Sequence, residues 1–200
     1  MNFEGAKKFI LEKLGRELDP HLTYHSISHT LDVCESAVRI ARLEGIQENN
    51  IVLLQTAALF HDSGMLITYK GHEEASVKII QDVLPSFNYT KDEITIIEGM
   101  ILNTKLPQAA WEKMGMILCD ADLDYLGRDD YFLISHQLKY EWDVLAFYPT
   151  TLKEWYELQL KFVGNHKYFT QSAVSTREET KQKNLSQVRE IMSNENHGGK

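Results

Sequence analysis

The stretch LLQTAALFHDSG, Leu53–Gly64, decides the fold prediction. It begins as an apolar run, presents His61 beside Asp62, and then reaches a glycine. The apolar residues recur at helical spacing, so we expect a buried helix that ends at Gly64. Burying a polar group without a partner costs roughly 2–7 kcal/mol, so this histidine and aspartate need a compensating interaction. A hydrogen bond that ties helices together or a bound cation would each supply one.

The same 3.6-residue period continues on both sides of this stretch, and no segment alternates like a strand. The pattern predicts an all-α protein of about eight helices, in one domain over residues 1–193 with a disordered tail over 194–200. We expect a cap from Ser26 or Ser28, another from Asn49 or Asn50, and a capping box of Thr90 with Glu93. We expect one later helix to begin at His72 and another to run from about Ala109 through the stretch Cys119–Gly127. Three more helices are expected over residues 128–145, 152–163 and 168–192.

Composition limits the class of protein. The 200 residues are 43% hydrophobic and 25% charged, which is ordinary for a globular protein. A net charge of -8 without a basic block argues against a nucleic acid duplex as partner. No apolar run approaches the roughly 20 residues that span a bilayer, so we expect no membrane association. Cys34 and Cys119 are expected to be buried free thiols, and the protein to be cytoplasmic.

Further residues that can bind metals occur on or beside apolar helices. His29, preceded by His25, shares a helical face with Val33, and His72 opens a helix. Asp122 lies between Asp120 and Asp124, on the same face as Leu118 and Leu126. An unpaired carboxylate on a buried face is costly, so we expect a metal site with nitrogen and oxygen ligands between helices. Such ligands suit Mn, Fe, Co, Ni or Zn.

These motifs together resemble the HD-domain metal-dependent phosphohydrolases. The resemblance rests on YHSISHT with His29, FHDSG with His61 and Asp62, and CDADLDYLG with Asp122, and it covers roughly residues 20–130. The helix start GHEEAS also resembles the family, and NHKYFT resembles one bacterial subgroup of uncertain substrate. The resemblance implies a single HD-domain-like helical bundle whose metal site lies between central helices, with ligands His29, His61, Asp62 and Asp122.

The resemblance also implies an enzyme, a phosphatase or phosphodiesterase. It would hydrolyse a phosphomonoester or phosphodiester of a nucleotide-like small molecule through a metal-activated water. Asp62 could accept a proton as well as bind the metal, and His72 could stabilise the phosphate or protonate the leaving group. We expect Thr104, Lys105 and His72 to contact the substrate. We expect His25 and Asp124 to lie beside the metal ligands and support them.

Four departures from the patterns of family subgroups narrow the expected mechanism and substrate. Met65 stands where some nucleotide phosphatases of the family have a catalytic glutamate, so that mechanism is doubtful. Met65 and Leu66 also replace the acidic pair of alarmone hydrolases. Relatives that bind two metals have a histidine where this chain has Asn103, so we expect one divalent ion, Mn, Fe, Co, Ni, Zn or Mg. The GYP motif of cyclic-dinucleotide phosphodiesterases is absent.

Alternatives remain open at this level. The chain could be a non-catalytic regulatory protein that binds a metal and a nucleotide. His72 could be a plain helix-capping residue, and Thr104 with Lys105 could belong to a solvated loop. His166 has no assigned role, and aromatic residues near the C-terminus would permit a homodimer.

Overall fold

A computed structural model describes the backbone of residues 1–197 and the side chains of residues 1–194. The expected all-α fold is confirmed, with nine α-helices and three short 3₁₀ helices among these residues. The chain divides into two compact units, Met1–Leu123 and Asp124–Lys200, which we call the N-terminal and C-terminal units. Whether residues 1–193 form one domain stays a prediction. No helix in the described part of the chain is long and apolar enough to cross a membrane.

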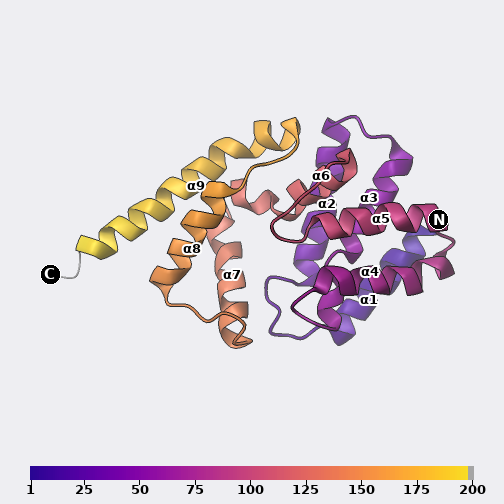
Figure 1. Cartoon of the computed structure of the whole chain (residues 1–200), viewed down its shortest axis with the longest axis horizontal. Coiled ribbons are helices and arrows are strands. Elements are labelled where there is room, and N and C mark those ends of the chain that lie inside the picture. The colour runs from indigo at the N-terminus through magenta and orange to yellow at the C-terminus, as the bar shows by residue number, and fades with distance from the viewer. Residues whose placement is uncertain (198–200) are drawn as a thin grey trace. The chain divides into compact units, whose positions relative to one another are not determined.

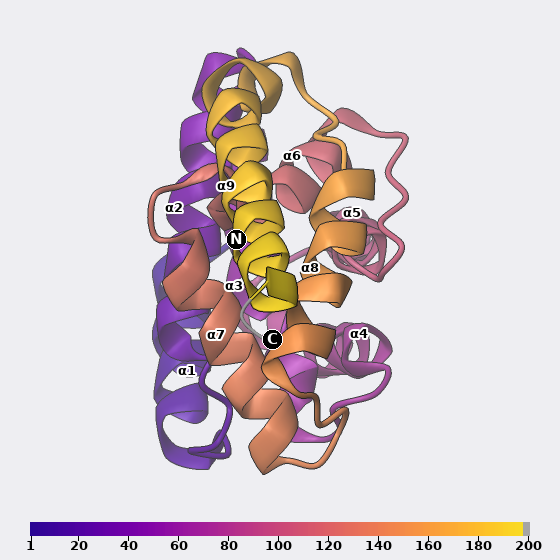
Figure 2. The ribbon, with the colours of Figure 1, turned by 90° about the vertical axis from the view of Figure 1, so that its left-hand side faces the viewer.

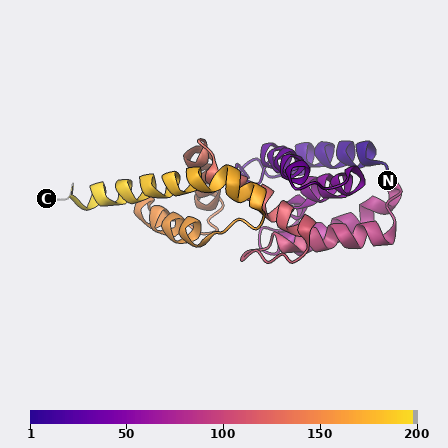
Figure 3. The ribbon, with the colours of Figure 1, turned by 90° about the horizontal axis from the view of Figure 1, so that it is seen from above.

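The N-terminal unit is built around one helix that is apolar on every side. This helix, α3 (Glu48–Phe60), packs against α1, α2, α5 and α6. Figures 2 and 3 show α1 and α5 on opposite sides of this unit, and α3 contacts both. An all-round apolar helix belongs in a core, as the sequence predicted. The other elements of the unit, labelled in Figure 1 apart from the 3₁₀ helices, are α1 (Phe3–Glu17), α2 (Ile27–Leu43), η1 (Ser63–Leu66), α4 (His72–Val83), η2 (Leu84–Phe87), α5 (Lys91–Asn103) and α6 (Lys113–Asp122).

Several helix starts follow the local signals in the sequence. The Ser26 hydroxyl accepts from the His29 N–H at the start of α2, and Thr90 and Glu93 form the predicted capping box of α5. The cap predicted at Asn49 or Asn50 is wrong, because the N-cap of α3 is Gln47, two or three residues earlier, and Gln47 makes no side-chain cap bond.

The segment between α5 and α6 differs from the expectation. We expected a helix from about Ala109 through Gly127, but α6 covers only Lys113–Asp122. Before it, the chain folds back, and the Asn103 side chain donates to the Ala109 carbonyl at 2.8 Å. After it, the residues Asp124–Gly127 form the 3₁₀ helix η3. A hydrogen bond outside the helices therefore replaces the expected helix before α6, and a 3₁₀ turn replaces it after α6.

The C-terminal unit consists of η3 with α7 (Tyr131–Val144), α8 (Leu152–Asn165) and α9 (Gln171–His197). Figure 3 shows α9 as the longest helix, and α8 packs against it. The buried Trp155 indole donates to the Ser135 hydroxyl at 3.2 Å and contacts the Trp142 ring. The helix α9 continues past Met192 to His197, so it includes the first residues of the expected tail, and residues 198–200 lie outside the described part.

Candidate metal centre

His61 and Asp62 follow directly after the last residue of α3. The turn is fixed by Ser63, whose hydroxyl donates to the Phe60 carbonyl at 2.7 Å. His61 Nδ1 lies 2.8 Å from the Ala58 carbonyl oxygen, and because a carbonyl only accepts, this bond assigns a proton to Nδ1. The other ring nitrogen, Nε2, then points its lone pair into the space beside Asp62, which is the arrangement that metal-binding histidines adopt.

Four side chains from three helix regions converge on that space. His29 Nε2 lies 3.5 Å from Asp62 Oδ2, and His61 Nε2 lies 3.1 Å from the same oxygen. Asp122 Oδ1 lies 3.3 Å from His29 Nε2 and 3.5 Å from His61 Nε2. The structure therefore brings together the four residues that the sequence predicted as metal ligands, from α2, the end of α3 and the end of α6.

Asp122 is held in place by a residue of the preceding loop. Gln108 Nε2 donates to Asp122 Oδ2 at 3.1 Å and to the Cys119 carbonyl at 3.3 Å. The second carboxylate oxygen, Oδ1, thereby remains directed at the two histidines. The loop between α5 and α6 thus contributes to the site by orienting one carboxylate.

The electrostatics of these groups are strongly coupled. Burial alone would lower the pKa of His61, but the Asp62 and Asp122 carboxylates outweigh burial and raise it well above its usual value. Burial would raise the pKa of Asp122, yet the His29 and His61 rings lower it to about 2. Both aspartates are therefore ionised at neutral pH, and they stabilise positive charge at this place, whether on an imidazole or on a cation.

These residues fit a divalent cation. His29 Nε2, His61 Nε2 and Asp62 Oδ2 are buried polar atoms that make no hydrogen bond. Leaving such atoms unsatisfied costs about 1–3 kcal/mol each, so a ligand that contacts all three removes a large penalty. Metal–ligand bonds of about 2.1 Å place neighbouring ligand atoms roughly 3.0–3.4 Å apart, close to the observed distances of 3.1 to 3.5 Å. The sequence expectation of a cation at these residues is compatible with this geometry.

The start of α4 is pressed against the turn after Asp62. A Cβ atom on Gly64 would lie 1.9 Å from the His72 carbonyl oxygen and 2.7 Å from the Ser76 nitrogen, so only glycine fits here. The Ser76 hydroxyl accepts from the Gly64 N–H at 2.7 Å and donates to the His61 carbonyl at 2.6 Å. This clamp brings His72 Nε2 to 3.3 Å from Asp62 Oδ1.

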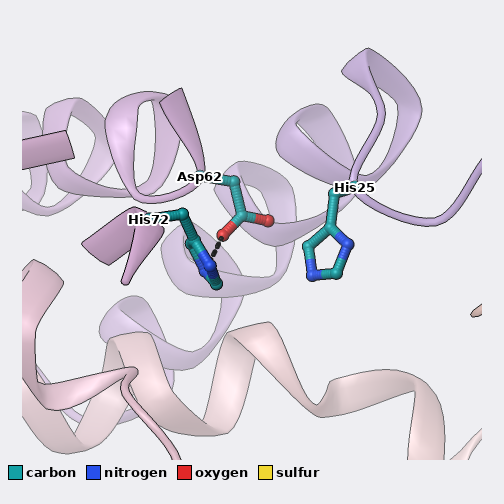
Figure 4. A group of neighbouring side chains, drawn as sticks. All are labelled: His25, Asp62 and His72. Atoms are coloured by element: carbon teal, nitrogen blue, oxygen red, sulfur yellow. Dashed lines mark ion pairs between the residues drawn. The ribbon is translucent and has the colours of Figure 1, made fainter. Parts of the chain in front are cut away.

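Two further histidines form a second group of possible metal ligands with Asp62. Ligand atoms of His25, Asp62 and His72 all lie within 4.8 Å of one another. Figure 4 shows the rings of His25 and His72 on either side of the Asp62 carboxylate, with the ion pair to His72 dashed. His72 Nδ1 donates to the Tyr69 carbonyl at 3.0 Å, which leaves Nε2 facing Asp62. His25, expected to support the ligands, therefore has a ring nitrogen within 4.8 Å of a carboxylate oxygen of Asp62.

Other predicted residues lie elsewhere. The Thr104 side chain is buried and its hydroxyl donates to the Ile101 carbonyl, whereas the exposed Lys105 pairs with Glu74 in the first turn of α4. Their substrate roles stay predictions. Asp124 belongs to the C-terminal unit, where Arg177 Nε and Nη2 donate to its two oxygens at 2.8 and 2.9 Å.

His166 also lies in the C-terminal unit, after α8, and its carbonyl accepts from the buried Lys181 ammonium at 2.8 Å. Its ring makes an edge contact with Tyr168, at 4.6 Å between ring centroids. These contacts describe a packed, locally bonded histidine, and they assign it no chemical role.

Sequence reasoning missed three residues that shape the site. Gln108 lies in the polar loop that drew attention to Lys105, but an amide that holds a carboxylate has no periodic signature. Ser76 lies one helical turn after His72, a spacing that places it on the same face of α4. Glu73, in the first turn of α4, is buried, with its Oε1 3.7 Å from His72 Nε2.

Comparison with known proteins agrees with this arrangement. The family model described as HD domain matches residues 26–125, half of the chain, and includes the four predicted ligands. An uncharacterized protein of Clostridium beijerinckii is 34% identical over 92 residues, which cover 43% of this chain and 56% of that protein. The alignment thus spans little more than half the length of this relative.

A solved structure extends the likeness to almost the whole chain. The crystal structure of a predicted HD superfamily hydrolase from an uncultured Thermotogales bacterium matches with a TM-score of 0.61. The match covers 96% of this chain and 91% of the other, at 20% sequence identity, so it concerns the fold. The family match and the shared fold confirm the resemblance that the motifs indicated: this chain belongs to the HD-domain family.

Proposed function

We propose that this protein is a metal-dependent phosphohydrolase that cleaves a phosphomonoester or phosphodiester of a nucleotide-like small molecule. One observation carries the proposal. Three buried ligand atoms, from His29, His61 and Asp62, make no hydrogen bond yet converge beside the Asp122 carboxylate. Membership of the HD-domain family and the fold shared with a predicted hydrolase of that superfamily support the same class of activity.

The roles of the residues follow from their positions. When bound by His29, His61, Asp62 and Asp122, a divalent cation would polarise a phosphoryl oxygen and lower the pKa of a water. Asp62 is ionised and its Oδ1 lies on the side away from His29 and His61, so it can accept a proton there. The carboxylates of Asp62 and Glu73 raise the pKa of His72 against the effect of burial, so His72 can hold a proton for the leaving group.

Lys105 is our candidate for a contact with the outer part of the substrate. Its ammonium pairs with Glu74, two residues after His72, in the exposed first turn of α4. An exposed ion pair is worth about 0–1 kcal/mol, so a substrate phosphate can compete with Glu74 for Lys105 at little cost. This contact would add affinity without touching the reacting atoms.

Release of nitrophenol from mono- and bis-nitrophenyl phosphate tests the proposal. Each substrate is offered with Mn, Fe, Co, Ni, Zn or Mg, followed by a panel of nucleotide mono-, di- and cyclic esters. We expect metal-dependent turnover, and a loss of at least about 100-fold in Asp62→Asn, since a ligand and proton acceptor is removed. Asp92→Asn, at an exposed position of α5, is the matched control and should keep full activity.

The outcomes separate the enzyme from a regulatory protein. Turnover in Asp62→Asn equal to wild type would place the activity elsewhere or in a contaminant. Metal binding without turnover of any ester in the panel would contradict the proposed hydrolysis and favour a binding protein.

A further inference from the structure

His29 differs from His61 in what holds its ring. The Ala58 carbonyl fixes the His61 ring, because it accepts from Nδ1 at 2.8 Å. Among the described residues, the polar contacts of the His29 ring are with Asp62 and Asp122, through Nε2. Those two carboxylates are themselves candidate ligands, so a further neighbour must hold the His29 ring in the direction of the cation.

Tyr24 is that neighbour. Its side chain is buried, and its ring centroid lies 4.6 Å from that of His29, with 31° between the ring planes. This is the spacing of a stacked or tilted aromatic pair. His25 in turn makes an edge contact with the Tyr24 ring, at 4.8 Å and 82°. The last torsion of a histidine side chain has a broad minimum, so a stacked ring restricts a rotation that the side chain alone leaves open.

The backbone places the Tyr24 and His29 rings against each other. The Tyr24 carbonyl accepts from the Ser26 N–H at 2.7 Å, and the Ser26 hydroxyl accepts from the His29 N–H at 3.4 Å. His29 lies in the first turn of α2, so the tyrosine, the helix cap and the histidine belong to one turn. Because these bonds are local, the ring contact forms with the helix start and does not require the cation.

We propose that Tyr24 is a positioning residue of the metal centre, whose ring holds the His29 imidazole so that Nε2 faces the cation. The inference rests on the metal centre of the proposed function, but it does not depend on turnover. Tyr24 acts through His29 and needs no contact with the cation or the substrate. Loss of its ring should therefore weaken cation binding and change the geometry of the bound ion, although all four ligands stay in the chain.

The competing interpretation is a tyrosine that only fills the core. Tyr89 provides the matched comparison, because it is as buried as Tyr24 and its hydroxyl lies 2.8 Å from Thr56 Oγ1. Leucine at either position removes a buried tyrosine ring from the N-terminal unit. Tyr24→Leu also removes a ring that is stacked on a candidate ligand. A core-filling role predicts equal effects of the two variants on cation binding.

Titration of the full chain with Co²⁺ separates the two interpretations, since the visible absorption of Co²⁺ depends on its ligands and their geometry. Tyr24→Leu should lower Co²⁺ affinity, measured by equilibrium dialysis, by about fivefold or more and shift the absorption band. Tyr24→Phe keeps the ring, so its affinity should stay within about twofold of wild type, with the wild-type band. Tyr89→Leu should lose stability in urea but keep the wild-type affinity and band.

A double-mutant cycle tests whether Tyr24 acts through His29. In a chain that carries His29→Ala, the further change Tyr24→Leu should alter Co²⁺ affinity by less than about twofold, because the ring that it positions is gone. Far-UV circular dichroism verifies that each variant is folded. If Tyr24→Leu does not fold, Tyr24→Met takes its place, since methionine adapts to irregular gaps in a core.

Any of three results would overturn the proposal: wild-type Co²⁺ affinity and band in the folded Tyr24 variant that lacks the ring, an equal loss in Tyr24→Phe, or an undiminished loss in the His29→Ala chain. The result is distinct from that of the proposed function. Hydrolysis by the wild type together with any of these results would refute the positioning role alone. The expected pattern of Co²⁺ binding without hydrolysis of any ester would refute the function alone.

Discussion

Ser76→Ala probes the clamp between the turn after Asp62 and α4. The Ser76 side chain is fully buried, and its hydroxyl makes two short hydrogen bonds, to the Gly64 N–H and the His61 carbonyl. Alanine removes the hydroxyl but leaves a buried donor and a buried acceptor behind. Each such group costs about 1–3 kcal/mol, so the free energy of unfolding of the metal-free protein should fall by about 2–4 kcal/mol.

Urea unfolding followed by far-UV circular dichroism measures this change. Ser86→Ala is the matched control, because the Ser86 hydroxyl is exposed and bonds only to the nearby Val83 carbonyl, and it should change stability by less than about 0.5 kcal/mol. The same clamp positions the His61 backbone, so affinity for a cation should also fall, by about tenfold. If Ser76→Ala destabilises no more than Ser86→Ala does, the two bonds do not hold the centre together and the reasoning is wrong.

Three further predictions concern other contacts. Gly64→Ala should destabilise the protein by about 2 kcal/mol or more and lower its affinity for a cation, because the added Cβ would overlap backbone atoms of α4. A stability in urea equal to that of the wild type would contradict this close approach. Gln108→Leu should weaken Mn²⁺ binding by about 10–100-fold, measured by dialysis, because Asp122 loses its orienting donor; unchanged affinity would show that Asp122 needs no such support. Burial raises the pKa of Cys119 and Tyr89 above their ordinary values of 9.0 and 10.0. The folded state therefore keeps these protons to a higher pH than the unfolded state does, so the urea midpoint should fall as pH rises above about 9. A midpoint that stays constant up to pH of about 11 would refute this last prediction.

Local sequence signals were enough to predict the all-α class, several helix starts and the metal-type residues. The capping box of Thr90 and Glu93 and the helix start at His72 depend on residues within one turn, so they are visible without a structure. Asp62 and Asp122 were recognisable because an ionised side chain on an apolar helix face needs a partner. Their meeting point could be inferred from the family resemblance, and the structure places them around it.

The remaining parts of the site depend on contacts between segments far apart in the chain. Gln108 reaches Asp122 only because the loop after α5 folds back, and no periodicity encodes that path. Glu73 is buried in the first turn of α4, which packs against the turn at Gly64, and no local sequence signal indicates that burial. His25 was treated as a supporting residue, because its distance from His72 depends on a segment without regular structure before α2.

The distribution of tryptophans makes the two units optically distinguishable. Trp155 is fully buried in the C-terminal unit, with Trp142 against it, whereas Trp111 of the N-terminal unit is 85% exposed. Trp111 is therefore already in water before unfolding, and intrinsic fluorescence will report mainly the loss of structure around Trp155. The far-UV circular dichroism signal reports the helix content of both units. Fluorescence and dichroism curves that separate along one urea titration would identify two cooperative folding units, and curves that coincide would identify one.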